Sequence, residues 1–290
     1  LTYNAVDSIV IGRFAGNEAL AAVGTAEPVM NFLIMGITGL SVGTSVLMSN
    51  FYGAGKYGDL KKEMGTCLRI GGIFSLLLFT GGLLASGIIL KLMQVPEDIL
   101  DLSVSYLRVI FIGMPFTCLY NIYAAALRSV GDSKTPIRFL AFSSILNGIL
   151  DVIFVAGFGL GVFGAGLATD IAESVSAVAC MIYVFKKVPV LHISRRDFVP
   201  DKEFTKKTLH YGSTTALQQC AQPIGKLAIQ GMVNTLGVST IAAFNAVGKI
   251  EDFALVPERS VSTAMMTFIA QNDGAKEKER VRKGFFSGIT

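Results

Sequence analysis

The sequence predicts an all-α protein that crosses a membrane several times, and three observations support this class. Of the 290 residues, 52% are hydrophobic and 16% are charged, whereas soluble domains carry about 25% charged residues. The mean hydropathy is +0.58. The apolar residues form long runs, and a membrane-crossing helix needs about 20 such residues. Inside lipid these runs must be helical, because the backbone groups have no water to bond.

The composition also excludes other classes of protein. Disorder requires few apolar residues and a high net charge, but the net charge here is +4. The four cysteines stand alone and form no CxxC pair, and the two histidines lack an HExxH spacing. We therefore assign no metal site and no resident cofactor. The basic loops lack interleaved aromatic residues, so we expect no nucleic-acid partner.

Eight apolar spans and the start of a ninth follow one another along the chain. They cover residues 1–11, 19–51, 67–93, 104–127, 137–157, 162–185, 209–236, 240–270 and 284–290. The first span is short, so we expect the chain to be a fragment that lacks part of it. A polar segment, expected to be a cytoplasmic linker over 186–207, separates the spans into two groups. We expect an N-terminal lobe over 1–185 and the start of a C-terminal lobe over 208–290.

Basic residues mark every second loop and so orient the spans. Of the 25 Lys and Arg residues, 19 lie in or beside the loops after the second, fourth, sixth and eighth spans. Because loops rich in Lys and Arg stay in the cytoplasm, we expect these four loops to be cytoplasmic. The predicted location is the cell (inner) membrane, crossed several times.

The chain contains an internal repeat. A shift of 221 residues places Leu20-Ala21-Ala22 on Ile241-Ala242-Ala243 and Gly53-Ala54 on Gly274-Ala275. The second span therefore corresponds to the eighth, which comes six spans later, and because six is even both copies have the same orientation. Parallel repeats of this kind occur in transporters. We expect a transporter of six plus six helices, of which spans 9–12 are missing from this chain.

Four motifs carry a resemblance to a known family. They are residues 6–13 ("VDSIVIGR"), 39–55 ("GLSVGTSVLMSNFYGAG"), 126–136 ("ALRSVGDSKTP") and 147–151 ("NGILD"). Together and in this order they resemble the multidrug and toxic compound extrusion (MATE) family, most of all its DinF-like branch. The resemblance covers the whole chain. It implies a secondary antiporter that works by alternating access of two helical lobes.

Four polar side chains within the spans form the candidate cation or proton site. Asp7 lies in the first span and Thr169 in the sixth, while Asn147 and Asp151 share one face of the fifth because they are four residues apart. An ionised carboxylate at mid-membrane costs about 2.5–3.5 kcal/mol, so it should bind a cation or a proton. In the family that the chain resembles, the matching positions form the cation and proton site of the N-terminal lobe. The alternative for Asn147 and Thr169 is that they only hydrogen-bond neighbouring helices.

A second group of polar residues ranks below these four. As cavity-lining or supporting residues we consider Glu27, Asp170, Glu173, Gln218, Lys249 and Asp252. Glu27 could instead lie at the outer interface, and Asp170 and Glu173 could face a water-filled cavity. Lys249 and Asp252 are three residues apart and could form an internal ion pair. The sodium-coupled branch of the family has a glutamate in the seventh span that this sequence lacks, which argues against a sodium site in the second lobe. The expected coupling ion is H⁺ or Na⁺.

We therefore expect export of organic, often cationic, amphipathic compounds in exchange for H⁺ or Na⁺, by a monomer in the lipid bilayer that is not an enzyme. A lipid-linked saccharide flippase of related architecture is the first alternative. An intramembrane enzyme that uses paired aspartates is the second, although no GxGD-type signature is present. The GxGxxG pattern over 159–164 joins two apolar spans and not a strand and a helix. We expect those glycines to form a turn rather than a dinucleotide site.

Overall fold

The computed structural model describes residues 2–233 and 238–289, and the chain is helical through most of that range. The α-helices are α1 (Thr2–Phe14), α2 (Asn17–Gly53), α3 (Tyr57–Leu92), α4 (Glu97–Ser129), α5 (Lys134–Asp151), α6 (Gly161–Lys187), α7 (Lys202–Val233), α8 (Val238–Gly274) and α9 (Lys278–Ile289). A π-helix, η1 (Val152–Gly157), continues α5, and two 3-10 helices, η2 (Pro189–Leu191) and η3 (Arg195–Phe198), follow α6. Within the described residues, each predicted span falls on a helix, so the all-α prediction is confirmed.

Five helices among the described residues are long and apolar enough to cross a membrane. They are α2, α3, α4, the continuous segment of α5 and η1, and α6. Apolar side chains on α3 point away from the protein, and Leu84 is 83% exposed. A contiguous exposed apolar face of this kind marks contact with a partner or with lipid. Helices α2 to α6 thus form a polytopic membrane fold, while the spans predicted on α1, α7 and α8 stay predictions.

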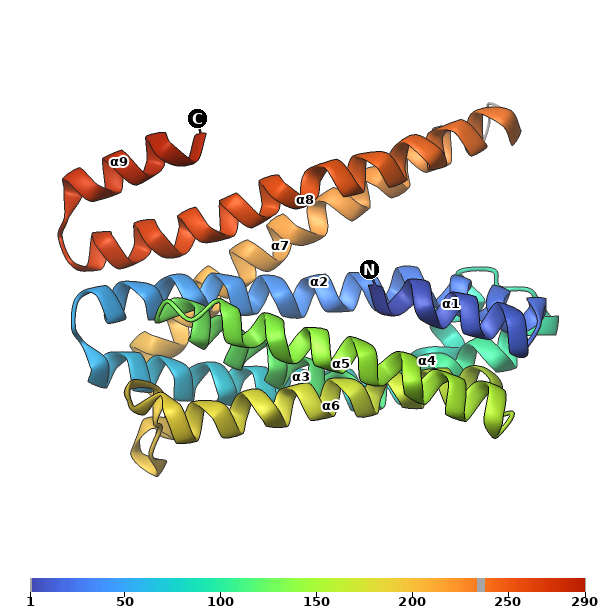
Figure 1. Ribbon diagram of the computed structural model, residues 1–290, viewed down its shortest axis with the longest axis horizontal. Coiled ribbons are helices and arrows are strands. Elements are labelled where there is room, and N and C mark those ends of the chain that lie inside the picture. The colour runs from blue at the N-terminus through green and yellow to red at the C-terminus, as the bar shows by residue number, and fades with distance from the viewer. Residues whose placement is uncertain (1, 234–237, 290) are drawn as a thin grey trace.

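Helix α4 lies at the centre of the first six helices. It packs against α2, α3 and α6, and α5 covers α6 on the side of α1 (Figure 1). The small residues Ala124, Ala125 and Ala126 on α4 are almost fully buried, and small side chains allow close helix packing in membranes. The turn between η1 and α6 contains Gly159 and Gly161 at positive φ, a conformation that glycine adopts without steric cost. Gly159 and Gly161 therefore form the predicted turn, whereas Gly164 lies within α6, close to Phe154 of η1.

Helix α7 begins earlier than the sequence predicts. Its first residue is Lys202, within the polar segment predicted as a linker over 186–207. The carboxylate of Asp201 accepts hydrogen bonds from the backbone N–H groups of Glu203 (2.9 Å) and Phe204 (3.2 Å). Such a capping interaction stabilises a helix start by about 1 kcal/mol, and hydropathy does not report it.

Helices α2 and α8 meet where both end, beside the basic loops, and diverge toward the opposite end (Figure 1). Gly53 lies against the backbone of Gln271, and Gly274 lies against the backbone of Asn50. Adding 221 to Gly53 and Asn50 gives Gly274 and Gln271, so each contact is the repeat-related copy of the other. This reciprocity supports the parallel repeat predicted from the sequence.

Candidate functional site

The four first-ranked polar residues converge in one buried cluster between α1, α5 and α6. Thr169 donates a hydrogen bond from Oγ1 to Oδ2 of Asp7 (3.3 Å), and the amide of Asn147 donates to Oγ1 of Thr169 (3.2 Å). Asp7 is 2% exposed, and Asn147 and Asp151 are 0% exposed. The structure thus brings together side chains that lie up to 162 residues apart.

The helix changes its form directly after Asp151. Helix α5 ends at Asp151, and the next six residues form the π-helix η1. Asn147 and Asp151 are one turn apart and both fully buried. π-Helical turns are rare and occur often at functional sites. No pattern in the sequence predicted this change of helix type.

Several oxygen atoms of this cluster have no hydrogen-bond donor among the described groups. They are Oδ1 of Asp7, Oδ1 of Asn147 and both carboxylate oxygens of Asp151. Asp7 and Asp151 nevertheless lie close enough for the charge of one to act on the other, and two like charges this close favour a proton on one of them. Oxygen atoms are the ligands that hard cations prefer. The cluster therefore has the chemistry to hold a proton or a small cation.

Tyr106 on α4 is a neighbour of this site that the sequence analysis missed. It is 2% exposed, and its ring packs beside Gly166 on α6. The charges of Asp7, Asp151 and Asp170 are all close enough to act on its hydroxyl group. A tyrosine in an apolar helix resembles a packing residue in sequence, so only the tertiary arrangement identifies it.

Asp170 and Glu173 form a second polar cluster, which faces α4. The hydroxyl of Thr117 donates to the carboxylate of Glu173, and the carboxylate of Asp170 fills the space beside Gly113 that a side chain would occupy. The side-chain amide of Asn121 donates a hydrogen bond to the backbone carbonyl oxygen of Thr117 (2.8 Å). The cluster has no hydrogen bond to Asp151 among the described contacts, so it lies beside the first site and not within it.

The other second-ranked residues lie apart from the Asp7 cluster. Glu27 on α2 is partly exposed, and its charge acts on Tyr106. Gln218 on α7 is exposed. Lys249 and Asp252 belong to α8, but their side chains lie outside the described residues, so their predicted ion pair stays a prediction. Among the described residues, no three His, Cys, Asp or Glu side chains are grouped as metal ligands.

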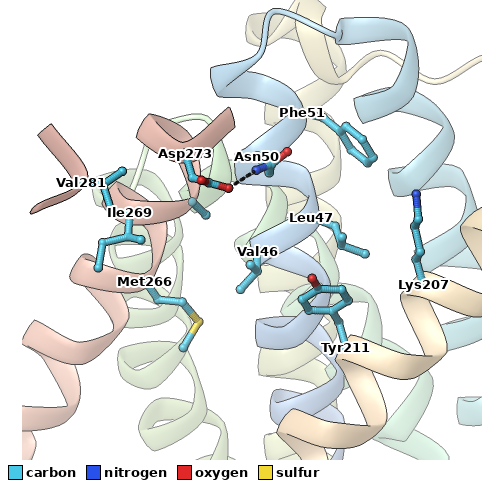
Figure 2. A pocket seen from close by; sticks show the side chains of 11 residues that line it. Val46, Leu47, Asn50, Phe51, Lys207, Tyr211, Met266, Ile269, Asp273 and Val281 are labelled. Atoms are coloured by element: carbon cyan, nitrogen blue, oxygen red, sulfur yellow. Dashed lines mark hydrogen bonds between the residues drawn. The ribbon is translucent and has the colours of Figure 1, made fainter. Parts of the chain in front are cut away.

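A cavity of about 570 Å³ lies near the basic-loop ends of α2 and α8. Its walls come from α2, α7, α8 and α9 and are mainly apolar. Figure 2 shows the amide of Asn50 on α2 donating to the carboxylate of Asp273 on α8 (3.1 Å) at one edge of this cavity. Lys207 and Tyr211 of α7 form the opposite wall (Figure 2). The cavity shares no residue with the Asp7 cluster.

The chain is similar to known proteins over most of its length. The model of the MatE family matches residues 1–153 and 215–290. The probable multidrug resistance protein YoeA of Bacillus subtilis (strain 168) is 32% identical, over 98% of this chain and 63% of its own. An FAD transporter of Shewanella oneidensis (strain MR-1) is 26% identical, over 100% of this chain and 65% of its own.

Solved structures show the same architecture. An outward-facing multidrug resistance MATE family transporter of the MOP superfamily superimposes with a TM-score of 0.90 and 26% sequence identity, over 99% of this chain and 64% of its own. The chain therefore spans less than two thirds of the length of the proteins that it matches.

Proposed function

The chain belongs to the MatE family, and from this premise we propose that the protein works as a secondary antiporter. It exports organic, often cationic, amphipathic compounds in exchange for H⁺ or Na⁺. The observation that carries this proposal is the buried cluster of Asp7, Asn147, Asp151 and Thr169, which joins two carboxyl groups with two neutral oxygen-bearing side chains.

A buried carboxyl pair suits coupling because its charge is costly unless a cation or proton binds. The cost of an uncompensated charge at mid-membrane is about 2.5–3.5 kcal/mol, and binding removes it. An ion can drive a conformational change only by binding the two states unequally. One charge that moves across the membrane gains about 2.3 kcal/mol per 100 mV, which is enough to bias export over many cycles.

The arrangement of α2 and α8 supports alternating access. They touch at the basic-loop end through Gly53 and Gly274 and diverge at the other end (Figure 1). If the basic loops are cytoplasmic, as the positive-inside rule predicts, this state is closed to the cytoplasm and open outward. The likeness to an outward-facing relative agrees with this orientation. We place the protein in the cell (inner) membrane as a monomer.

The class of substrate follows from charge. The buried ionisable side chains described in the first six helices include Asp7, Asp151 and Asp170, and an acidic interior favours organic cations. One relative is named a multidrug resistance protein and another an FAD transporter, so an anionic flavin is the natural counter-probe. The lipid-linked saccharide flippase has no specific observation in its favour here.

Efflux from proteoliposomes tests this proposal. The protein is reconstituted with a cationic dye inside, and an inward pH gradient or sodium gradient is imposed in separate runs. We expect gradient-driven dye efflux that Asp7→Asn and Asp151→Asn each abolish while the folded yield is unchanged. Asp101→Asn is the matched control, because Asp101 is an exposed acid on α4. Dye efflux that persists in both variants, or that needs neither gradient, would refute the assignment.

A further inference from the structure

A buried glutamate lies outside the site described above, near the start of α3. Glu63 is 0% exposed. Its Oε1 lies 2.9 Å from the hydroxyl of Thr208 on α7 and 3.8 Å from the thiol of Cys67 on its own helix. Its Oε2 has no hydrogen-bond partner among the described residues. The sequence analysis did not single out this residue, because it stands among the lysines of a basic loop.

The hydrogen bonds around Glu63 fit a neutral carboxylic acid. The hydroxyl of Thr208 also lies 2.7 Å from the carbonyl oxygen of Phe204, and one hydroxyl group carries a single hydrogen. When that hydrogen goes to Phe204, the Thr208 oxygen can only accept, and a protonated Glu63 supplies the donor. An ionised carboxylate at this place would be buried with an unpaired oxygen, which costs several kcal/mol without a cation.

The groups around Glu63 provide little positive charge. On α7 the cation that acts on it is Lys207, but Lys207 is bound to Glu203 at 2.7 Å and is half exposed. On its own helix the titratable group in contact with its carboxyl group is the thiol of Cys67. On α2 the neighbour of that thiol is Thr44, which is neutral. No described ion pair therefore neutralises Glu63.

Glu63 lies where the start of α7 packs against α3, a contact region that we call the joint between these two helices. Gly65 packs against the backbone of Asp197, and the guanidinium of Arg69 donates to the carbonyl of Phe198 (3.1 Å) and to the hydroxyl of Thr205 (2.9 Å). The segment that leads into α7 therefore folds back onto α3, next to the basic loops. Any motion that separates the start of α7 from α3 must break the Glu63–Thr208 contact and admit water.

We infer that Glu63 is a second proton-binding group of this protein, neutral while α3 and α7 are joined and ionised when this joint opens to water. Opening at the basic-loop end then releases a proton on that side, and closing takes one up. The inference goes beyond the proposed antiport and depends on it only in that the joint opens. Its consequence is that a high pH on the basic-loop side favours opening, whether or not Asp7 is functional.

Cys67 offers a native reporter of the opening, since it is 4% exposed and one turn from Glu63. Every other cysteine of the intact protein is replaced by alanine, and the rate of maleimide labelling is measured in detergent from about pH 6 to about pH 9. Each rate is divided by the rate of Glu63→Gln, because the neutral amide can still donate to Thr208 and the thiol titrates in both proteins. We expect the ratio to be near one at about pH 6 and to rise at least about fivefold by about pH 9, which corresponds to about 1 kcal/mol.

The controls separate this inference from a loss of folding and from the proposed function. Asp59→Asn removes a carboxylate one turn earlier on α3 and should leave the labelling of the parent protein unchanged. Thr208→Val keeps the carboxyl group but removes its partner, so it should speed labelling already at about pH 6. The Thr208→Val variant also tests the inference if Glu63→Gln does not fold. The rise should persist in Asp7→Asn, even if that variant shows that the antiport proposal is wrong. A ratio that stays within about twofold over the whole pH range would overturn the inference.

Discussion

The reciprocal glycine contact between α2 and α8 predicts that one methyl group shifts the conformational equilibrium. In Gly53→Ala the new Cβ would overlap the carbonyl oxygen and Cα of Gln271, which are backbone atoms that cannot rotate away. Overpacking of this kind costs about 1–3 kcal/mol. This clash destabilises only the state in which α2 and α8 touch at the basic-loop end. The equilibrium should therefore move about 5- to 150-fold toward the state in which the two helices are apart there.

The assay is the distance between spin labels placed at Lys56 and Lys276, two exposed positions beside the contact. We expect a larger population at long distance in Gly53→Ala, and the same in Gly274→Ala, whose Cβ would overlap the carbonyl oxygen of Asn50. The double variant should shift less than the sum of the two, since both changes act on one contact.

Gly36→Ala is the matched control for this prediction. Gly36 lies on the same helix, and a Cβ there meets no atom within 4 Å. Its distance distribution should equal that of the parent protein, with a gain in helix stability of up to about 1 kcal/mol. Equal distributions for Gly53→Ala and Gly36→Ala would show that the contact does not hold the basic-loop ends together.

Three further changes have defined outcomes. Thr169→Val leaves the amide of Asn147 without its acceptor, so the binding free energy of the cation or proton, measured by calorimetry, should weaken by about 1–3 kcal/mol. Thr169→Ser keeps a hydroxyl group and should retain the affinity. Equal affinities in Thr169→Val and the parent protein would show that Thr169 is only a packing residue. Gly113→Ala should lower thermal stability by about 1–3 kcal/mol because its Cβ would overlap the carboxylate of Asp170, and adding Asp170→Ala should restore part of the loss; no recovery would contradict that clash. Asp132 lies in the loop between α4 and α5. Burial opposes its negative charge, but the side chain and the backbone N–H of Thr135 donate hydrogen bonds to it, the latter to Oδ1 at 3.0 Å. These bonds outweigh burial and hold the pKa of Asp132 below its ordinary value of 3.8. Its stabilisation is therefore present above about pH 4 and is lost as the pH falls through the lower folded-state value, so Asp132→Ala should cost about 1 kcal/mol at neutral pH and little in acid, whereas Asp132→Asn should still cap the helix; a cost independent of pH would refute this.

The helices were predictable from the sequence because apolar runs, basic loops and the repeat all report on spans crossing a bilayer. The start of α7 was not, since it depends on a local cap by Asp201 within a polar segment. Hydropathy averages over such a segment, whereas a single side-chain bond to two backbone N–H groups decides where the helix begins.

The candidate site was predictable only in part. The spacing of Asn147 and Asp151 predicts that they share a helix face. Asp7 and Thr169 are 162 residues apart, so their contact could be expected only from the family resemblance. Tyr106 and Glu63 carry no local signal. One looks like a packing residue in an apolar helix and the other like a charge beside a loop, and their surroundings are set by helices distant in sequence.

The reciprocal contact of Gly53 with Gln271 and of Gly274 with Asn50 also bears on how the internal repeat arose. In a dimer with two-fold symmetry, residue i of one subunit touches residue j of the other, and j touches i. The same exchange here joins two segments of one polypeptide. A single ancestral gene for a six-helix chain, paired with its own copy side by side in the membrane, would have made this contact twice before duplication and fusion, and a glycine at one position would have satisfied both.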